Sequence, residues 1–161
     1  MTHAAQVVVA LRARGWRVGT AESLTAGLVA SGIADVPGCS DVLRGGVVAY
    51  AVDVKAAVLG IPDEVLDAGV VSREVAEAMA QAARRVLSAD VGIATTGVAG
   101  PDPHAGEPVG SVWIAVAGPE AVLSRHLRFD GDRAEVRRAT VSACWELVVA
   151  VCGEDLQVRP E

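Results

Sequence analysis

The stretch TAESLTAG, residues 20–27, stands where two segments of different hydrophobic pattern meet. Residues 17–21 form an apolar run typical of a β-strand, and residues 25–34 carry the small and apolar side chains of a buried helix. A carboxylate, Glu22, and a hydroxyl, Ser23, lie at the junction between them. In α/β proteins such junctions meet at one edge of the sheet, where ligands bind. The stretch therefore predicts an α/β fold with a candidate site at this edge.

The rest of the chain continues the alternation of helices and strands. Hydrophobic spacing and capping residues predict helices over residues 3–14, 55–59 and 73–87 and one that begins near Asp132, with strands over 45–52, 91–95, 111–117 and 121–129. The run 45–52 is almost entirely apolar, so we expect both faces of that strand to be covered in the middle of the sheet. These patterns predict one three-layer α/β/α domain with a mostly apolar central sheet, residues 1–153, and a polar tail, residues 154–161.

Composition restricts the class of protein. Of the 161 residues, 52% are apolar, which is enough for the core of one domain. The net charge of −6 argues against nucleic acid or an anionic membrane as partner, because both attract a basic surface. No CxxC pair, no signal peptide and no run of roughly 18 apolar residues is found. We expect a cytoplasmic protein that binds a small molecule; the apolar face of the last helix suits either the core or a homo-oligomer interface.

Ser23 has two interpretations. A serine at a strand-to-helix junction is a common N-cap, whatever the protein does. It is also a candidate nucleophile, because the free N–H groups of a helix start stabilise a developing oxyanion. The GxSxG pattern of α/β-hydrolases is absent. The stretch by itself leaves both interpretations open.

Lys55 is the only lysine among the 14 basic residues, and Tyr50 is the only tyrosine. A partly buried lysine loses its proton near neutral pH, as arginine does not, so Lys55 is either a general base or a stray surface lysine. Tyr50 ends a predicted strand and Lys55 begins a helix, so both can reach the sheet edge of Ser23, where the Tyr50 hydroxyl would relay a proton. Short-chain dehydrogenases also pair Tyr with Lys, but at YxxxK and behind a dinucleotide fingerprint that is missing here.

Two further regions are candidates for ligand binding. The loop 97–110 holds four glycines and three prolines, and such loops are more often functional than idle. Arg133 and Arg137 lie one helical turn apart near a helix start, which suits either a phosphate or a solvated charged face. His104 and His126 have no neighbour at metal-ligand spacing, so we expect no metal site. They are weaker candidates than Lys55 for activating a serine.

Seven motifs then follow one another in a characteristic order: TAESLTAG, VPGCSDVLRGGVVAY, Lys55 before Leu-Gly, GVVSREVAEAMA, ATTGVAGP, EPVGSVWIAVAG and FDGDRAEVR. In this order they resemble the CinA C-terminal domain family, which includes stand-alone nicotinamide mononucleotide deamidases. The resemblance covers residues 15–151. It implies a three-layer α/β domain that converts nicotinamide mononucleotide to nicotinate mononucleotide and ammonia, in pyridine nucleotide salvage, with no cofactor and no metal.

The resemblance also implies roles for individual residues. Ser23 matches the proposed nucleophile of the family, Lys55 its proposed base and Tyr50 its proton-relay partner. Thr96, Gly97 and Gly100 match the family's substrate-binding loop. We predict Thr25, Gly27, Gly46, Arg133 and Arg137 as further substrate-binding residues.

The chain departs from the family pattern at two motifs. Leu24 and Ala26 stand where the motif AESCTGG has Cys and Gly, and Ala51 and Val52 stand where SNEAK has Ser and Asn. A catalytically inactive nucleotide-binding or partner-binding module of the same fold is therefore the alternative function, since a shared fold does not guarantee activity.

Overall fold

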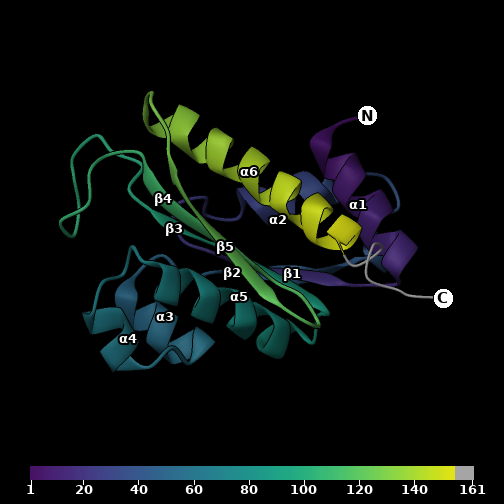
Figure 1. Ribbon diagram of the computed structural model, residues 1–161, viewed down its shortest axis with the longest axis horizontal. Coiled ribbons are helices and arrows are strands. Elements are labelled where there is room, and N and C mark those ends of the chain that lie inside the picture. Colours follow the sequence, from purple (N-terminus) through teal and green to yellow (C-terminus); the bar gives the residue numbers. More distant parts are fainter. Residues whose placement is uncertain (155–161) are drawn as a thin grey trace.

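The structure is a computed structural model that describes residues 1–154, and within them a five-stranded mixed sheet forms the middle layer (Figure 1). In spatial order its strands are β2 (Leu43–Val48), β1 (Val18–Glu22), β3 (Val91–Gly97), β4 (Ser111–Ala117) and β5 (Val122–Arg128). β1 pairs in parallel with both β2 and β3, whereas β3, β4 and β5 pair antiparallel. Every residue of β1 is buried, and β1 lies between β2 and β3, so the TAESLTAG stretch starts in the interior of the sheet.

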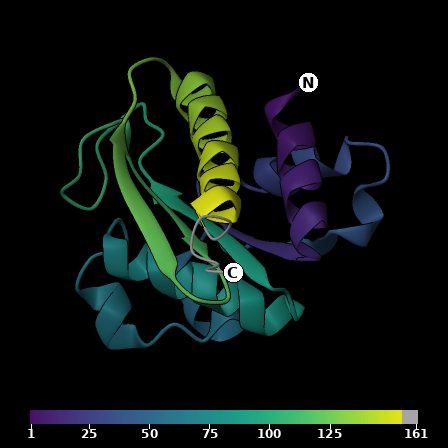
Figure 2. The same cartoon turned by 45° about the vertical axis from the view of Figure 1, so that its right-hand side comes forward.

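Helices cover both faces of the sheet, as Figures 1 and 2 show. One face carries α1 (His3–Arg14), α2 (Leu28–Ala34) and α6 (Arg133–Glu154), and the other carries α3 (Val52–Leu59), α4 (Asp63–Asp67) and α5 (Arg73–Leu87). Small residues let α5 approach closely: a Cβ on Gly92 of β3 would lie 1.9 Å from the Ala80 carbonyl oxygen. The predicted three-layer α/β/α architecture is confirmed.

Two long helices begin at the residues that the sequence indicated. The Ser72 hydroxyl accepts a hydrogen bond from the Val75 N–H (3.2 Å) at the start of α5. At the start of α6 the Glu135 N–H donates to Asp132 Oδ1 (2.8 Å), and the Asp132 N–H donates to Glu135 Oε2 (2.7 Å). This reciprocal pair is a capping box, which satisfies two backbone donors that the helix leaves free.

β2 differs from the expectation for residues 45–52. It lies at the edge of the sheet, not in the middle, and every second residue is exposed, including Val48 at 49%. The prediction of a central strand was wrong because an apolar run does not show whether both faces of the strand are covered. In β2 only alternate residues are partly buried. A Cβ on Gly46 would lie 2.5 Å from Thr20 Oγ1, so glycine is needed there for close approach. The strand also ends at Val48, and the following helix begins at Val52.

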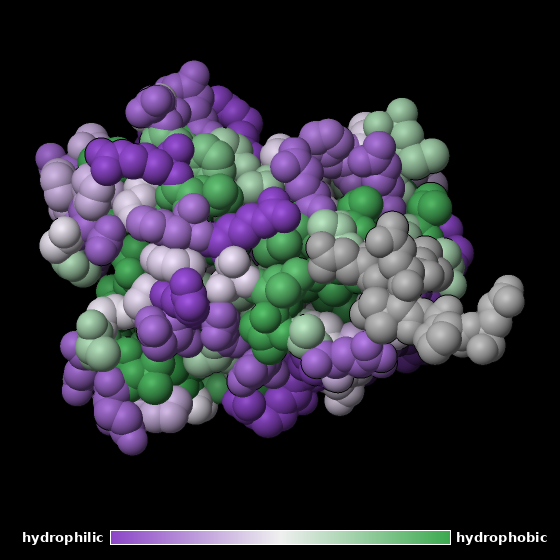
Figure 3. Space-filling view, in the orientation of Figure 1, coloured by the Kyte–Doolittle hydropathy of each residue, from purple (hydrophilic) through white to green (hydrophobic). Residues whose placement is uncertain are grey.

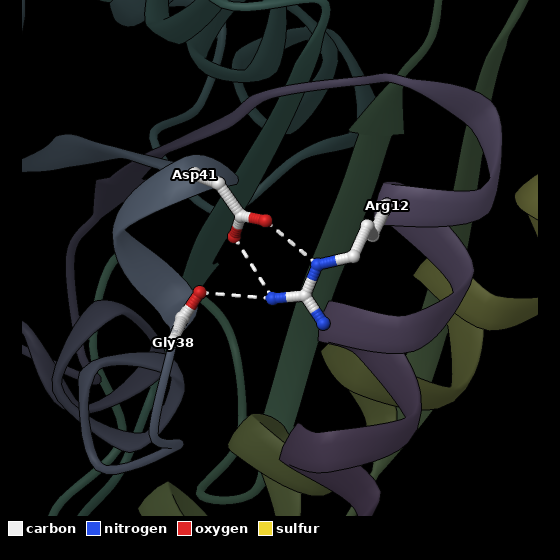
Figure 4. A network of polar contacts seen from close by, with 3 residues as sticks. All are labelled: Arg12, Gly38 and Asp41. Carbon is white, nitrogen blue, oxygen red and sulfur yellow. Dashed lines mark hydrogen bonds and ion pairs between the residues drawn. The ribbon is translucent and has the colours of Figure 1, made fainter.

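A guanidinium joins α1 to the 3₁₀ turn η1 (Cys39–Asp41) that precedes β2 (Figure 4). Arg12 Nε donates to Asp41 Oδ2 (2.7 Å), and Arg12 Nη2 donates to Asp41 Oδ1 (2.9 Å) and to the Gly38 carbonyl (2.9 Å). The hydrogen bonds from Arg12 lower the pKa of the Asp41 carboxyl. Because both side chains are exposed, the pair orients this segment more than it stabilises the fold.

Hydrophilic and hydrophobic residues are mixed over the face shown in Figure 3, and one continuous group of hydrophobic residues lies near its middle. On β5, Leu123 and Leu127 are partly buried and pack against the core beneath α6. Within residues 1–154 no helix is long and apolar enough to cross a membrane. Of the predicted tail, 154–161, only Glu154 is described, as the last residue of α6; the rest lies outside the described residues.

Candidate active site

A cavity of about 340 Å³ opens beyond the carboxyl ends of the parallel strands. Its lining residues come from the segments that follow β1, β2 and β3, from the turn before α5 and from the first turn of α6. Ser23, Tyr50 and Lys55 all line it, although they belong to separate segments. The cavity thus occupies the sheet edge where strand-to-helix junctions place ligand sites.

Lys55 and Ser23 are in direct contact in this cavity. Lys55 Nζ lies 3.0 Å from Ser23 Oγ, and Nζ also donates to the carbonyl oxygens of Ala49 (2.8 Å) and Tyr50 (2.9 Å). The Lys55 side chain is 2% exposed, and burial lowers its pKa to about 8. No carboxylate forms an ion pair with Lys55 within the described residues, so no opposite charge offsets the cost of burying the ammonium form.

The three contacts of Lys55 fit either protonation state of its amine. An ammonium group has three N–H donors, but a neutral amine has two donors and one lone pair. When Lys55 is neutral, its two N–H groups can serve the Ala49 and Tyr50 carbonyls, and the lone pair then faces the Ser23 hydroxyl. In this arrangement the Ser23 O–H can donate a hydrogen bond to Lys55 Nζ, which is the geometry that general-base activation of a hydroxyl requires.

Ser23 is held by β3 and is not a helix N-cap. Its N–H donates to the Thr95 carbonyl (3.1 Å) and lies 3.2 Å from Thr95 Oγ1, which also contacts Thr25 Oγ1 (2.8 Å). α2 begins only at Leu28, behind Gly27 as N-cap in the left-handed conformation (φ 95°). The cap interpretation of Ser23, and the expected helix start at residue 25, were therefore wrong. A tight turn separates the hydroxyl from the helix and leaves it in the cavity.

The Glu22 carboxylate, and not Ser23, caps the N-terminus of α2. This carboxylate, fully buried, accepts from the N–H groups of Gly27 (2.9 Å), Val29 (3.1 Å) and Ala30 (3.0 Å) and from Thr20 Oγ1 (3.0 Å). The N–H groups of α2 are therefore used internally. Sequence reasoning missed this role: acidic groups favour helix starts, but Glu22 lies in a strand, outside the usual cap position.

Two other backbone N–H groups remain beside Ser23. In the turn 23–27, those of Leu24 and Thr25 have no hydrogen-bond partner within residues 1–154, although Leu24 is 3% exposed and Thr25 fully buried. Buried backbone N–H groups are seldom unpaired. Successive N–H groups of this kind form concavities that bind anions. Because Leu24 lines the cavity directly after Ser23, its N–H is a candidate oxyanion donor.

Arg137 orients this turn from α6. Its Nε donates to the Leu24 carbonyl (2.9 Å) and its Nη2 to the Thr25 carbonyl (3.2 Å). In a trans peptide the C=O and N–H groups point in opposite directions. Holding the Leu24 carbonyl toward α6 therefore turns the Thr25 N–H away from α6. Arg137 is not among the residues that line the cavity, so the structure places it behind the turn.

Tyr50 and Arg133 meet at the rim of the cavity. Arg133 Nη2 donates to the Tyr50 hydroxyl (2.6 Å), and Arg133 Nη1 donates to the Gly100 carbonyl (2.7 Å). Tyr50 is 52% exposed, and its contact with Lys55 is through the backbone carbonyl. The structure thus places the Tyr50 hydroxyl on Arg133, whereas Lys55 reaches Ser23 without a relay.

Comparison with known proteins agrees with this architecture. Residues 1–152 match the CinA C-terminal domain. The chain belongs to the CinA C-terminal domain family. A CinA-like protein of Frankia casuarinae is 46% identical over 136 residues, which are 84% of this chain and 31% of that protein. The chain spans about a third of the length of the curated relatives that it matches first.

Solved CinA structures have the same fold. A CinA superfamily protein from Klebsiella pneumoniae 700603 superposes with a TM-score of 0.91 at 30% identity, covering 94% of this chain and 96% of that one. The competence/damage inducible protein CihA from Agrobacterium tumefaciens gives a TM-score of 0.88 at 37% identity, covering 92% and 93%.

The remaining predicted residues of this CinA domain fall into two groups. Thr96, Gly97 and Gly100 line the cavity, and the Thr96 hydroxyl donates to the carbonyl of Val70, another lining residue (2.7 Å). Thr25, Gly27 and Gly46 do not line it. They shape the turn and the strand behind Ser23, through the contacts given above.

No hydrogen bond joins His104 or His126 to Ser23 within the described residues. His104 lines the cavity from the loop after β3, and His126 lies on β5, with Nε2 2.9 Å from Ser111 Oγ. Among the described residues, no group of three or more His, Cys, Asp or Glu side chains could hold a metal ion.

Proposed function

We propose that this CinA domain hydrolyses the carboxamide of nicotinamide mononucleotide to nicotinate mononucleotide and ammonia, with Ser23 as nucleophile and Lys55 as base. The observation that carries the proposal is the 3.0 Å contact between Lys55 Nζ and Ser23 Oγ at a buried position. Serine–lysine pairs perform acyl-transfer chemistry on unrelated folds. The resemblance of the sequence motifs to nicotinamide mononucleotide deamidases of the CinA family supports the choice of substrate.

The reaction would begin with neutral Lys55. Its amine takes the Ser23 proton while Ser23 Oγ bonds to the amide carbon, and the amide oxygen becomes an oxyanion. The Leu24 N–H, directly after the nucleophile, would donate to that oxyanion, a contribution of about 3 kcal/mol per donor. The proton on Lys55 then passes to the leaving nitrogen, the C–N bond breaks, and ammonia departs. Water, deprotonated by Lys55, cleaves the resulting ester and restores Ser23.

Arg133 is the group best placed for the phosphate of the nucleotide. A guanidinium has five N–H donors, and the described contacts of Arg133, to Tyr50 and Gly100, use one N–H on each of two nitrogens. Further donors remain at the cavity rim for a phosphate oxygen. Arg137 instead donates to the backbone carbonyls of Leu24 and Thr25. Of the two arginines predicted from helical spacing, Arg133 would therefore bind the phosphate and Arg137 would orient the turn 23–27.

Ammonia release from nicotinamide mononucleotide tests the proposal. The wild-type chain should release ammonia and the Ser23→Ala variant should not. Ser31→Ala is the matched control, because Ser31 is an exposed serine on α2. Substrate binding without turnover by the wild type would refute the amidase and support the inactive binding module. Equal activity of wild type and Ser23→Ala would refute the nucleophile.

A further inference from the structure

Outside the cavity, Ser111 lies between two polar side chains from different segments. Its hydroxyl donates to Glu107 Oε2 (2.9 Å), and its Oγ lies 2.9 Å from His126 Nε2. Ser111 is 2% exposed, at the start of β4, whereas Glu107 belongs to the loop that follows β3 and His126 to the edge strand β5. A buried hydroxyl therefore connects the loop to the edge of the sheet.

The order of these three groups excludes a second nucleophile. A serine hydroxyl has one hydrogen to donate, and a carboxylate only accepts, so Ser111 uses this hydrogen in its hydrogen bond to Glu107. His126 Nε2 must then carry a hydrogen and donate it to Ser111 Oγ. In a catalytic triad the histidine lies in the middle and accepts the serine proton. Here the serine lies in the middle, so the arrangement connects the loop after β3 to β5, and no group in it activates the Ser111 hydroxyl as a nucleophile.

Ser111 and Glu107 both hold the wall of the cavity. The Glu107 N–H donates to the His104 carbonyl (2.9 Å), and the His104 N–H donates to the Glu107 carbonyl (3.1 Å). The Val98 N–H donates to the Ser111 carbonyl (2.9 Å). Since His104 and Val98 line the cavity, the Ser111 side chain and backbone both reach residues of its wall.

His126 connects Ser111 to a second part of the cavity lining, the turn of Val70 and Val71. The His126 ring stacks on the Trp113 ring with centroids 4.6 Å apart and an interplanar angle of 6°. The Arg73 guanidinium lies 5.5 Å from the centre of the Trp113 ring. Arg73 begins α5, directly after the turn of Val70 and Val71, which line the cavity. A stacked imidazole and a cation over the indole hold this turn and the sheet together.

We infer that Ser111 and His126 are positioning residues, which hold the cavity wall of residues 98–104 in the shape that binds substrate. They touch no reacting atom in this proposal, which rests on the proposed amidase function for its kinetic readout. Loss of the Ser111 hydroxyl should therefore weaken substrate binding and leave the Lys55–Ser23 chemistry intact. Removing one hydrogen bond to a charged group should raise KM by about tenfold and change kcat by less than about twofold.

The chain offers a matched control for Ser111→Ala. Ser124 lies on the same face of the sheet, and its hydroxyl donates to Glu77 Oε1 (2.6 Å), which belongs to α5. Ser124→Ala thus removes the same kind of serine–glutamate contact without touching the cavity wall. His126→Phe is the second variant, because it keeps a ring for stacking on Trp113 and removes the Nε2 donor. We expect it to raise KM in the same direction as Ser111→Ala.

Amide hydrogen exchange over residues 98–110 gives a readout that needs no activity. Exchange in this segment should be faster in Ser111→Ala than in wild type or Ser124→Ala. Unchanged exchange, or a fall in kcat with KM unaltered, would overturn the positioning role. If the wild type hydrolyses no nicotinamide mononucleotide, the proposed function fails, and the exchange measurement alone still decides the role of Ser111.

Discussion

Lys55 Nζ lies 3.0 Å from Ser23 Oγ, although 32 positions separate the two residues in sequence. The carbonyls of Ala49 and Tyr50 fix the amine from behind. Both carbonyls accept from the same nitrogen that contacts Ser23. The identity of the base and the pH at which it works should therefore both depend on this contact.

Lys55→Arg should lower kcat by about 10³-fold, because the guanidinium keeps the charge but does not give up its proton. Lys55→Met should lower it equally, since it removes the base and keeps an unbranched side chain. Both are measured as ammonia release at saturating nicotinamide mononucleotide. Arg125→Lys, on the exposed edge strand, is the control for a basic exchange. Turnover by Lys55→Arg near the wild-type rate would rule out Lys55 as the base.

The pH profile follows from the pKa of about 8 for Lys55. Only the neutral amine accepts the Ser23 proton, so kcat/KM should rise with pH and level off above about 8. Below that value it should fall about tenfold per pH unit. A profile that is flat between pH 6 and pH 9 would show that the rate does not depend on Lys55 losing a proton.

The same titration should affect stability. The unfolded chain holds the Lys55 proton up to about pH 10.5, the folded chain only up to about pH 8. Between these values the unfolded state binds more protons, so the free energy of unfolding should increase with pH. Urea unfolding of wild type and Lys55→Met at pH 7.5 and 9.5 measures this. The free energy of unfolding should increase more between these pH values in wild type than in Lys55→Met, which lacks the titrating amine. An identical pH dependence of the two proteins would contradict a pKa of Lys55 that burial lowers.

Arg137→Gln should lower kcat by about ten- to a hundredfold with little change in KM. Without the hydrogen bonds to the Leu24 and Thr25 carbonyls the turn 23–27 would shift, and the Leu24 N–H that it carries would be misaligned as oxyanion donor, which weakens transition-state binding alone. The neighbouring Arg138→Gln is the control. Arg138 is exposed on the same helix, and no polar contact of its side chain is found within residues 1–154. Equal kcat and KM for the two variants would show that Arg137 does not orient the turn 23–27 for catalysis.

Glu22→Gln should destabilise the fold by about 2–3 kcal/mol, since an amide group would face backbone donors in a buried site. For a chain of this size that corresponds to a melting temperature lower by about 5–10 °C. Glu146→Gln, at an exposed position of α6, should change the melting temperature by less than about 2 °C. A similar effect of the two substitutions would mean that the Glu22 carboxylate does not cap α2.

Local patterns in the sequence were sufficient for most of the elements. The capping box at Asp132 and Glu135 and the cap at Ser72 predicted two helix starts correctly, because caps bond to residues three positions away. The paired strands around Gly118 were also predicted correctly. β2 was misplaced, since an apolar run does not reveal which strands flank it.

By itself, the sequence determined the layered α/β class and drew attention to Ser23 and to the single lysine, because these depend on spacing and residue type. Only the tertiary structure decided that the amine meets the hydroxyl directly, that Glu22 caps α2, and that Arg137 holds the Leu24 carbonyl from 113 positions away. The physical reason is distance along the chain. Contacts between remote segments arise only when the sheet brings them to one edge, and no local pattern records them.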